Sequence, residues 1–64
     1  MPYAIRLPRT GEVEQHRWRS LARAEQYVEA VFTPTSTAEP CVEIVDDDQR
    51  VVATWIVRSR EWVR

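Results

Sequence analysis

The chain has 64 residues, a formal net charge of −1 and an apolar fraction of 44%, which together indicate one small globular domain rather than a disordered segment. This charge balance excludes a general electrostatic attraction to nucleic acid or acidic membranes, and no apolar run approaches the roughly 18 to 20 residues that span a bilayer. A single cysteine excludes an internal disulfide, so we expect oligomerisation to enlarge a core that is limited at this length.

Two strands joined by a turn are predicted at the start of the chain. Tyr3, Ile5 and Leu7 alternate with less apolar residues, the pattern of a half-buried strand. Residues 8–11 contain a proline and the only glycine, and they predict a turn. Val13 to Trp18 follow as a mostly polar run, which predicts either an edge strand or a poorly ordered hairpin arm.

An amphipathic helix is predicted from Leu21 to Phe32. Its apolar positions recur at spacings of three and four and are widened by two aromatic residues: Leu21, Ala24, Val28 and Val31, with Tyr27 and Phe32. Ser20 is a suitable N-cap, because its hydroxyl can accept from a free amide of the first turn. Pro34 ends the helix, and Thr33 to Pro40 form a polar loop back to the sheet.

A β-hairpin is predicted from two runs of β-branched residues, Cys41 to Val45 and Val51 to Val57, around an acidic loop. The loop length sets the register, and a shift of one residue exchanges the two faces. A three-residue loop groups Val42, Ile44, Val52, Thr54 and Ile56 on one face. A four-residue loop groups Val42, Ile44, Val51, Ala53, Trp55 and Val57. In either register Trp55 and Ile56 point to opposite faces.

These elements predict an α+β fold of one domain over residues 1–64: a small antiparallel β-sheet with one amphipathic helix on one face, in the order β-β-α-β-β. The tail, residues 58–64, either extends the last strand or forms a short terminal turn. The run Val51 to Val57 is apolar on both faces, and a strand buried on both sides needs two covering layers. One helix supplies one layer, so we expect a second molecule to supply the other.

The sequence therefore predicts a non-enzymatic protein-interaction module that forms a homodimer or docks on a protein partner. The contact would lie on the open face of the sheet. The predicted interface residues are Trp55, Val57, Trp18 and Trp62, because aromatic residues dominate the binding energy of such surfaces.

Single-stranded nucleic-acid binding is the alternative hypothesis. Arginine and tryptophan alternate around Trp18 and in the tail, so that Arg17, Arg19, Arg58 and Arg60 would contact phosphates. Stacking on the bases would fall to the aromatic residues Tyr3, Trp18, Trp55 and Trp62. The balanced charge and the neighbouring glutamates argue against this function.

The sequence carries no catalytic, cofactor or metal signature. Asp46 to Asp48 lack the alternate ligand spacing of a calcium loop and predict a solvated turn. His16 and Cys41 are the only residues of their types, which are too few for a zinc site. A catalytic pair would also need a third, orienting group. We expect Cys41 to pack as a small apolar residue and His16 to lie on the surface.

The composition predicts a cytoplasmic protein from a GC-rich bacterial or phage genome. The nine basic residues are all arginine, and lysine and asparagine, whose codons are AT-rich, are absent. The first residues lack the basic and apolar regions of a signal peptide, and a lone thiol fits a reducing compartment.

Overall fold

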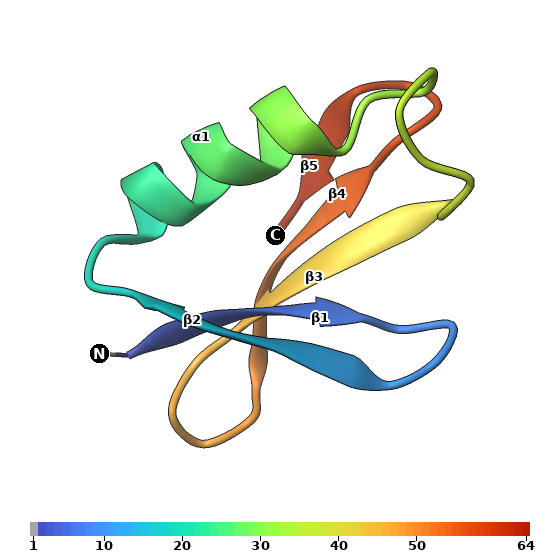
Figure 1. Ribbon diagram of the computed structural model, residues 1–64. Helices are drawn as coiled ribbons and strands as arrows, with labels where there is room; N and C mark the ends of the chain where they lie inside the picture. The colour runs from blue at the N-terminus through green and yellow to red at the C-terminus, as the bar shows by residue number, and fades with distance from the viewer. Residues whose placement is uncertain (1) are drawn as a thin grey trace.

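The computed structural model describes residues 2–64 as a five-stranded antiparallel sheet with one helix across one face (Figure 1). Along the chain the elements are β1 (Tyr3–Leu7), β2 (Glu12–Trp18), α1 (Leu21–Val31), β3 (Cys41–Val45), β4 (Val51–Ile56) and β5 (Glu61–Val63). Their order across the sheet is β2-β1-β3-β4-β5. The predicted α+β class and the order of the first five elements are confirmed, and β2 is the edge strand that its polar sequence predicts. No helix between residues 2 and 64 is long and apolar enough to span a membrane.

The tail takes neither of the two predicted forms. It reverses direction after β4 and returns as β5, with Trp62 paired to Trp55 and Val63 to Thr54. The reversal is closed by Arg60, whose amide donates to the carbonyl of Ile56 at 2.8 Å and whose φ is 56°. A non-glycine residue in this left-handed region is uncommon, which explains why the turn leaves no Gly or Asn signal in the sequence.

The β3–β4 hairpin combines both registers predicted from the sequence. Near the loop Val45 pairs with Val51, as a three-residue loop requires. One extra residue on β4 then forms a β-bulge, after which Ile44 pairs with Ala53 and the helix-facing side continues through Trp55. A bulge shifts the side-chain alternation by one position. The bulge therefore accounts for the apolar Val52, which packs against the core although it is adjacent in sequence to Ala53.

Helix α1 begins one residue after Ser20, whose hydroxyl accepts from the Arg23 amide at 3.4 Å, so the predicted N-cap is confirmed. The helix ends at Val31, and Phe32 serves as its C-cap. Ala24 and Val28 are fully buried against the sheet. Val31 was predicted to belong to the apolar stripe, but its side chain is 43% exposed, because the buried Phe32 occupies that position at the end of the helix.

Trp55 lies on the face of the sheet that α1 covers, and only 3% of its surface is exposed. Its indole Nε1 donates to the carbonyl oxygen of Phe32 at 2.9 Å. The last carbonyls of a helix have no partner within the helix, so this hydrogen bond satisfies one of them. The prediction that Trp55 needs a second molecule to cover it is wrong.

Two further tryptophans lie on the edge strands and flank the helix. Trp18 on β2 packs on Tyr27 of α1 with ring centroids 5.0 Å apart, and Trp62 on β5 packs on Trp55 at the same centroid distance. The Nε1 of Trp62 also donates to Glu29 Oε2 on α1 at 2.7 Å. The edge strands thus extend the cover that one helix provides, which the count of layers from the sequence did not include.

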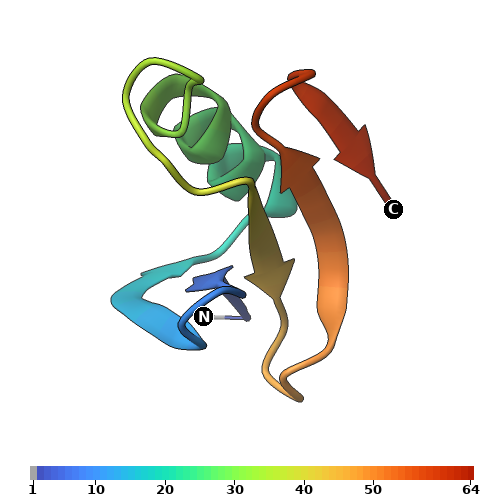
Figure 2. The same cartoon turned by 90° about the vertical axis from the view of Figure 1, so that its right-hand side faces the viewer.

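Residues 2–64 place no covering layer on the opposite face of the sheet, yet part of that face is buried. Ala4 and Val45 are paired neighbours on β1 and β3 with no exposed surface. Register shifts lie beside this pair on both sides, in β1–β2 and in β3–β4. Bulges bend strands and increase their twist, and Figure 2 shows the β1–β2 hairpin turned across the direction of β3 and β4. The rest of this face carries an ion pair between Arg6 and Glu43 at 2.7 Å.

Replacing Trp55 or Trp18 by phenylalanine compares an indole that makes a hydrogen bond with one that makes none. Trp55→Phe removes the hydrogen bond to the helix end and part of a filled core position, and we expect it to lower the free energy of unfolding by about 2–4 kcal/mol. Trp18→Phe is the matched control, because the Trp18 Nε1 is buried without a hydrogen-bond partner within residues 2–64. Its replacement should cost less than about 1 kcal/mol. Urea denaturation followed by circular dichroism measures both, and equal losses would contradict this assignment.

Candidate functional site

The structure divides the four predicted interface residues into two groups. Trp55 and Val57 are each 3% exposed inside the subunit, so neither offers surface to a partner. Trp18 and Trp62 are half-buried at the two flanks of α1. They lie on opposite edge strands, β2 and β5, so they do not form one contact surface. None of the four lies on the open face where we expected the interface.

The arginines predicted to contact nucleic acid are also divided. Arg17 and Arg19 lie where β2 leads into α1, whereas Arg58 and Arg60 lie in the connection from β4 to β5. Since β2 and β5 are the two edges of the sheet, the two pairs occupy opposite sides of the molecule. The aromatic residues predicted to stack on bases are all on the helix-covered face or its flanks. The structure therefore contains no platform that unites these residues.

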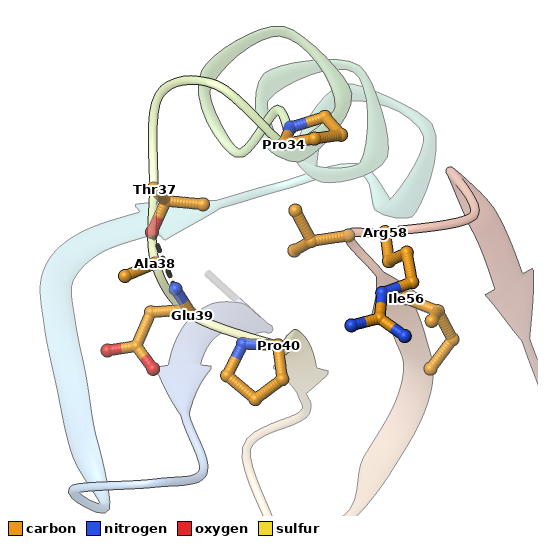
Figure 3. Close-up of a pocket in the computed structure, with 8 residues that line it drawn as sticks. Pro34, Thr37, Ala38, Glu39, Pro40, Ile56 and Arg58 are labelled. Carbon is orange, nitrogen blue, oxygen red and sulfur yellow. Dashed lines mark hydrogen bonds between the residues drawn. The ribbon is translucent and has the colours of Figure 1, made fainter.

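A pocket of about 580 Å³ lies between the loop after α1 and the end of β4. We call it the proline pocket; its lining residues are Pro34, Thr37, Ala38, Glu39, Pro40, Ile56, Val57 and Arg58. Figure 3 shows Thr37, Glu39 and Pro40 along one side and Ile56 and Arg58 along the other. Its volume lies within the range of about 300–1,000 Å³ that is usual for ligand sites, and most of its walls are apolar as in such sites.

The pocket is built from a loop whose shape is fixed by local hydrogen bonds. Ser36 Oγ donates to the carbonyl of Val31 and accepts from the Thr33 amide at 2.9 Å, which ties the loop to the end of α1. The amide of Val57 donates to the carbonyl of Pro40 at 3.1 Å and joins the far end of the loop to β4. Because both ends are held, the two walls of the pocket keep a defined separation.

Two charged residues of the pocket differ in how they are compensated. Glu39 accepts hydrogen bonds from Arg9 at 2.9 and 3.1 Å, and this contact lowers the pKa of Glu39 below its usual range. In Figure 3 its carboxylate points away from the pocket. Arg58 takes part in no ion pair within residues 2–64, and its guanidinium points toward the open space of the pocket. The pocket therefore has one uncompensated positive charge.

Exposed apolar side chains continue from the pocket onto the open face of the sheet. Ile56 lines the pocket and is half-exposed, and its neighbour on β3 is Cys41. Val63 is a diagonal neighbour of Ile56 on β5 and is 56% exposed. Diagonal neighbours across antiparallel strands are close enough for large side chains to share one contact. We call Ile56, Val63 and the proline pocket together the docking surface.

A second hollow of about 390 Å³ lies at the junction of β2 and α1. We call it the arginine groove; it is lined by His16, Arg17, Trp18, Arg19, Ser20 and Arg23. The three arginines and His16 are exposed. Trp18 is one of its lining residues and already contacts His16, with ring centroids 4.5 Å apart in an edge-to-face arrangement.

Cys41 and His16 are not brought together. Cys41 begins β3 and His16 lies on β2, with β1 between these strands. Burial, followed by the charges of Glu43 and Glu39, raises the pKa of the Cys41 thiol. An activated cysteine needs a lowered pKa instead. Within the part of the chain that the structure describes, no three His, Cys, Asp or Glu side chains gather closely enough to hold a metal ion.

The docking surface was missed by sequence reasoning because its parts are far apart along the chain. The sequence predicts Pro34 and Pro40 only as the ends of a helix and a loop, and Arg58 only as a contact to phosphate. The bulge in β4 and the return of β5 place Ile56 and Val63 on the open face. A signal was present in the two prolines, which restrict the backbone at both ends of this loop and leave it without two amide donors.

The reactivity of Cys41 tests the assignment of this thiol as structural. Because its pKa is raised in the folded chain, we expect alkylation by iodoacetamide to rise at a higher pH in the folded protein than in the urea-unfolded chain. The stability that the protonated thiol contributes is fully present below its unfolded pKa and is lost as the pH rises through its folded pKa. An alkylation midpoint below that of the unfolded chain would contradict this assignment.

Comparison of the chain with models of protein families, with curated proteins and with solved structures found no match. The docking surface and the arginine groove therefore have to be interpreted from their own geometry and charge.

Proposed function

We propose that this protein is a small, non-enzymatic protein-binding module that holds its partner on the docking surface. The observation that carries the proposal is the proline pocket, an apolar hollow with one uncompensated guanidinium, that of Arg58. Such a pocket suits an aliphatic side chain of the partner that has a carboxylate beside it. The aliphatic group would lie between Pro40 and Ile56, and the carboxylate would accept hydrogen bonds from the guanidinium.

The exposed valine beside the pocket supports a macromolecular partner over a small ligand. Val63 is the most exposed of the large apolar side chains between residues 2 and 64, and it continues the apolar surface beyond the mouth of the pocket. Protein interfaces combine a central apolar anchor with surrounding contacts that exclude water. A side chain in the pocket and a flat contact over Val63 together would form such an arrangement.

The chemistry of the described residues supports a binding role over catalysis. The thiol of Cys41 is a poor nucleophile because its pKa is raised, and His16 lies on another strand. Nucleic-acid binding across the sheet is less well supported than binding of a protein, because the arginines are divided and the tryptophans are packed against or beside the helix.

The proposal is tested by comparing three immobilised forms of the chain. Wild type, Ile56→Asp and Val51→Asp are used to capture proteins from a lysate of the cells that produce the chain. Val51 is an exposed valine at the far end of β4 and serves as the matched control. We expect a partner to be retained by wild type and by Val51→Asp, and to be lost, by tenfold or more, with Ile56→Asp, because a buried unpaired carboxylate replaces an apolar contact.

The charge of the partner is tested by a further variant. Arg58→Gln should weaken the interaction with the captured partner by about tenfold, the loss expected for a hydrogen bond to a charged group. Titration by calorimetry measures this change, and circular dichroism shows that each variant remains folded. Equal retention of every captured protein by wild type and Ile56→Asp would contradict the proposal.

A further inference from the structure

The arginine groove is an uncompensated basic surface at the other end of the sheet from the proline pocket. The ion pairs of residues 2–64 use Arg6, Arg9 and Arg64, so that Arg17, Arg19 and Arg23 have no carboxylate partner. All three are exposed around one concave surface of about 390 Å³. Like charges held close together in this way favour a ligand that carries several negative charges.

The same chain carries a convex acidic surface, the loop between β3 and β4. Asp46 is used inside the loop, where its Oδ1 accepts from the amides of Asp48 and Arg50 at 2.9 and 3.0 Å. This leaves the exposed carboxylates of Asp47 and Asp48 at the end of the hairpin, which we call the acidic tip. The loop projects beyond the rest of the sheet at the bottom of Figures 1 and 2.

We infer that two copies of the chain associate by placing the acidic tip of one copy in the arginine groove of the other. The tip is convex and carries two free carboxylates, and the groove is concave and carries three free guanidinium groups. No ion pair joins the two surfaces within one copy among the described residues. The loop is already ordered by its own hydrogen bonds, so it loses little conformational freedom on binding.

The positions of the two surfaces allow a symmetric pair in which the contact is made twice. Ala4 on β1 pairs with Arg17 on one side and with Val45 on the other, and Asp46 follows Val45 directly. The groove and the tip therefore lie at the same end of the sheet, where Arg17 and Val45 are about 10 Å apart by the usual strand spacing. A two-fold axis that passes between them would place each tip of the pair opposite the partner's groove.

An acidic protein segment fits the groove better than a nucleic-acid strand. Trp18 is already in contact with Tyr27 and His16, with ring centroids 5.0 and 4.5 Å away. Single-strand binding depends on aromatic rings that are open to the bases. The groove thus supplies charge without a stacking surface, which is sufficient for carboxylates.

The self-association is independent of the proposed function, because the docking surface lies at the opposite end of the strands. Ile56→Asp should therefore leave it unchanged. The dimer should be weak, since each contact is between exposed charges. Sedimentation equilibrium should show dimers at low salt that dissociate at least tenfold more readily when salt is raised from about 0.02 M to about 0.5 M.

Charge reversal on each surface provides the decisive test. One variant carries Arg17→Glu and Arg23→Glu in the groove, and the other carries Asp47→Arg and Asp48→Arg at the tip. A glutamate in place of Arg23 stands three residues after the N-cap Ser20, a favourable position, so the groove variant should keep its fold. Each variant alone should be monomeric, whereas an equimolar mixture should form a mixed dimer in which both contacts are again between opposite charges.

Three results would overturn the inference. The first is a wild-type chain that stays monomeric at about millimolar concentration and low salt. The second is association that neither salt nor the charge reversals change. The third is wild type that stays monomeric but binds an oligothymidylate through the groove with a steep salt dependence, which would assign the groove to nucleic acid.

Discussion

The hydrogen bond from the Trp55 indole to the carbonyl of Phe32 connects the sheet to the helix at the point where the chain leaves α1. It satisfies a helix-end carbonyl, fixes the C-cap residue Phe32 in the core and sets where the following loop begins. That loop forms one wall of the proline pocket, and the residues after Trp55 form the other wall. The pocket is therefore a consequence of the same contact that closes the core.

A chain of this length covers its sheet with one helix because the edge strands contribute side chains as well. Trp18 and Trp62 reach α1 from opposite edges, so apolar cover comes from strands that would otherwise be exposed. On the other face, the bulges curl the sheet around Ala4 and Val45 and bury them without a second layer. The edge-strand tryptophans and the bulges both increase the buried area without lengthening the chain, which matters most in small domains.

The regular elements were predictable because their signals are local. The helix α1, its cap at Ser20 and the strand β1 each depend on neighbours three or four residues away or closer, and the structure confirms these elements. The exceptions are Val31, which is exposed, and Ala4, which is buried on the other face of β1. The face of Trp55 is the one that the four-residue register predicts, but its burial was predicted wrongly because part of its cover comes from an edge strand that no run of neighbouring residues marks. The return of β5 was missed for a similar reason, since Arg60 adopts a conformation for which the sequence offers no glycine. The docking surface depends on these non-local features, whereas the arginine groove is lined by residues of one continuous segment, 16–23.

Only one strand pairing in the sheet connects distant parts of the sequence. The β1–β2, β3–β4 and β4–β5 pairs are hairpins, whereas β1 meets β3 through Ala4 with Val45, Ile5 with Ile44 and Arg6 with Glu43. The molecule thus consists of a β1-β2-α1 half and a β3-β4-β5 half. The two halves are joined by the β1–β3 pairing and by the packing of α1 on strands of the second half. Formation of the β1–β3 pairing must overcome the loop-closure entropy of the intervening chain, so this step should limit the folding rate. A chain cut within the loop after α1 should therefore reassemble from its two fragments, because neither half contains a complete core of its own.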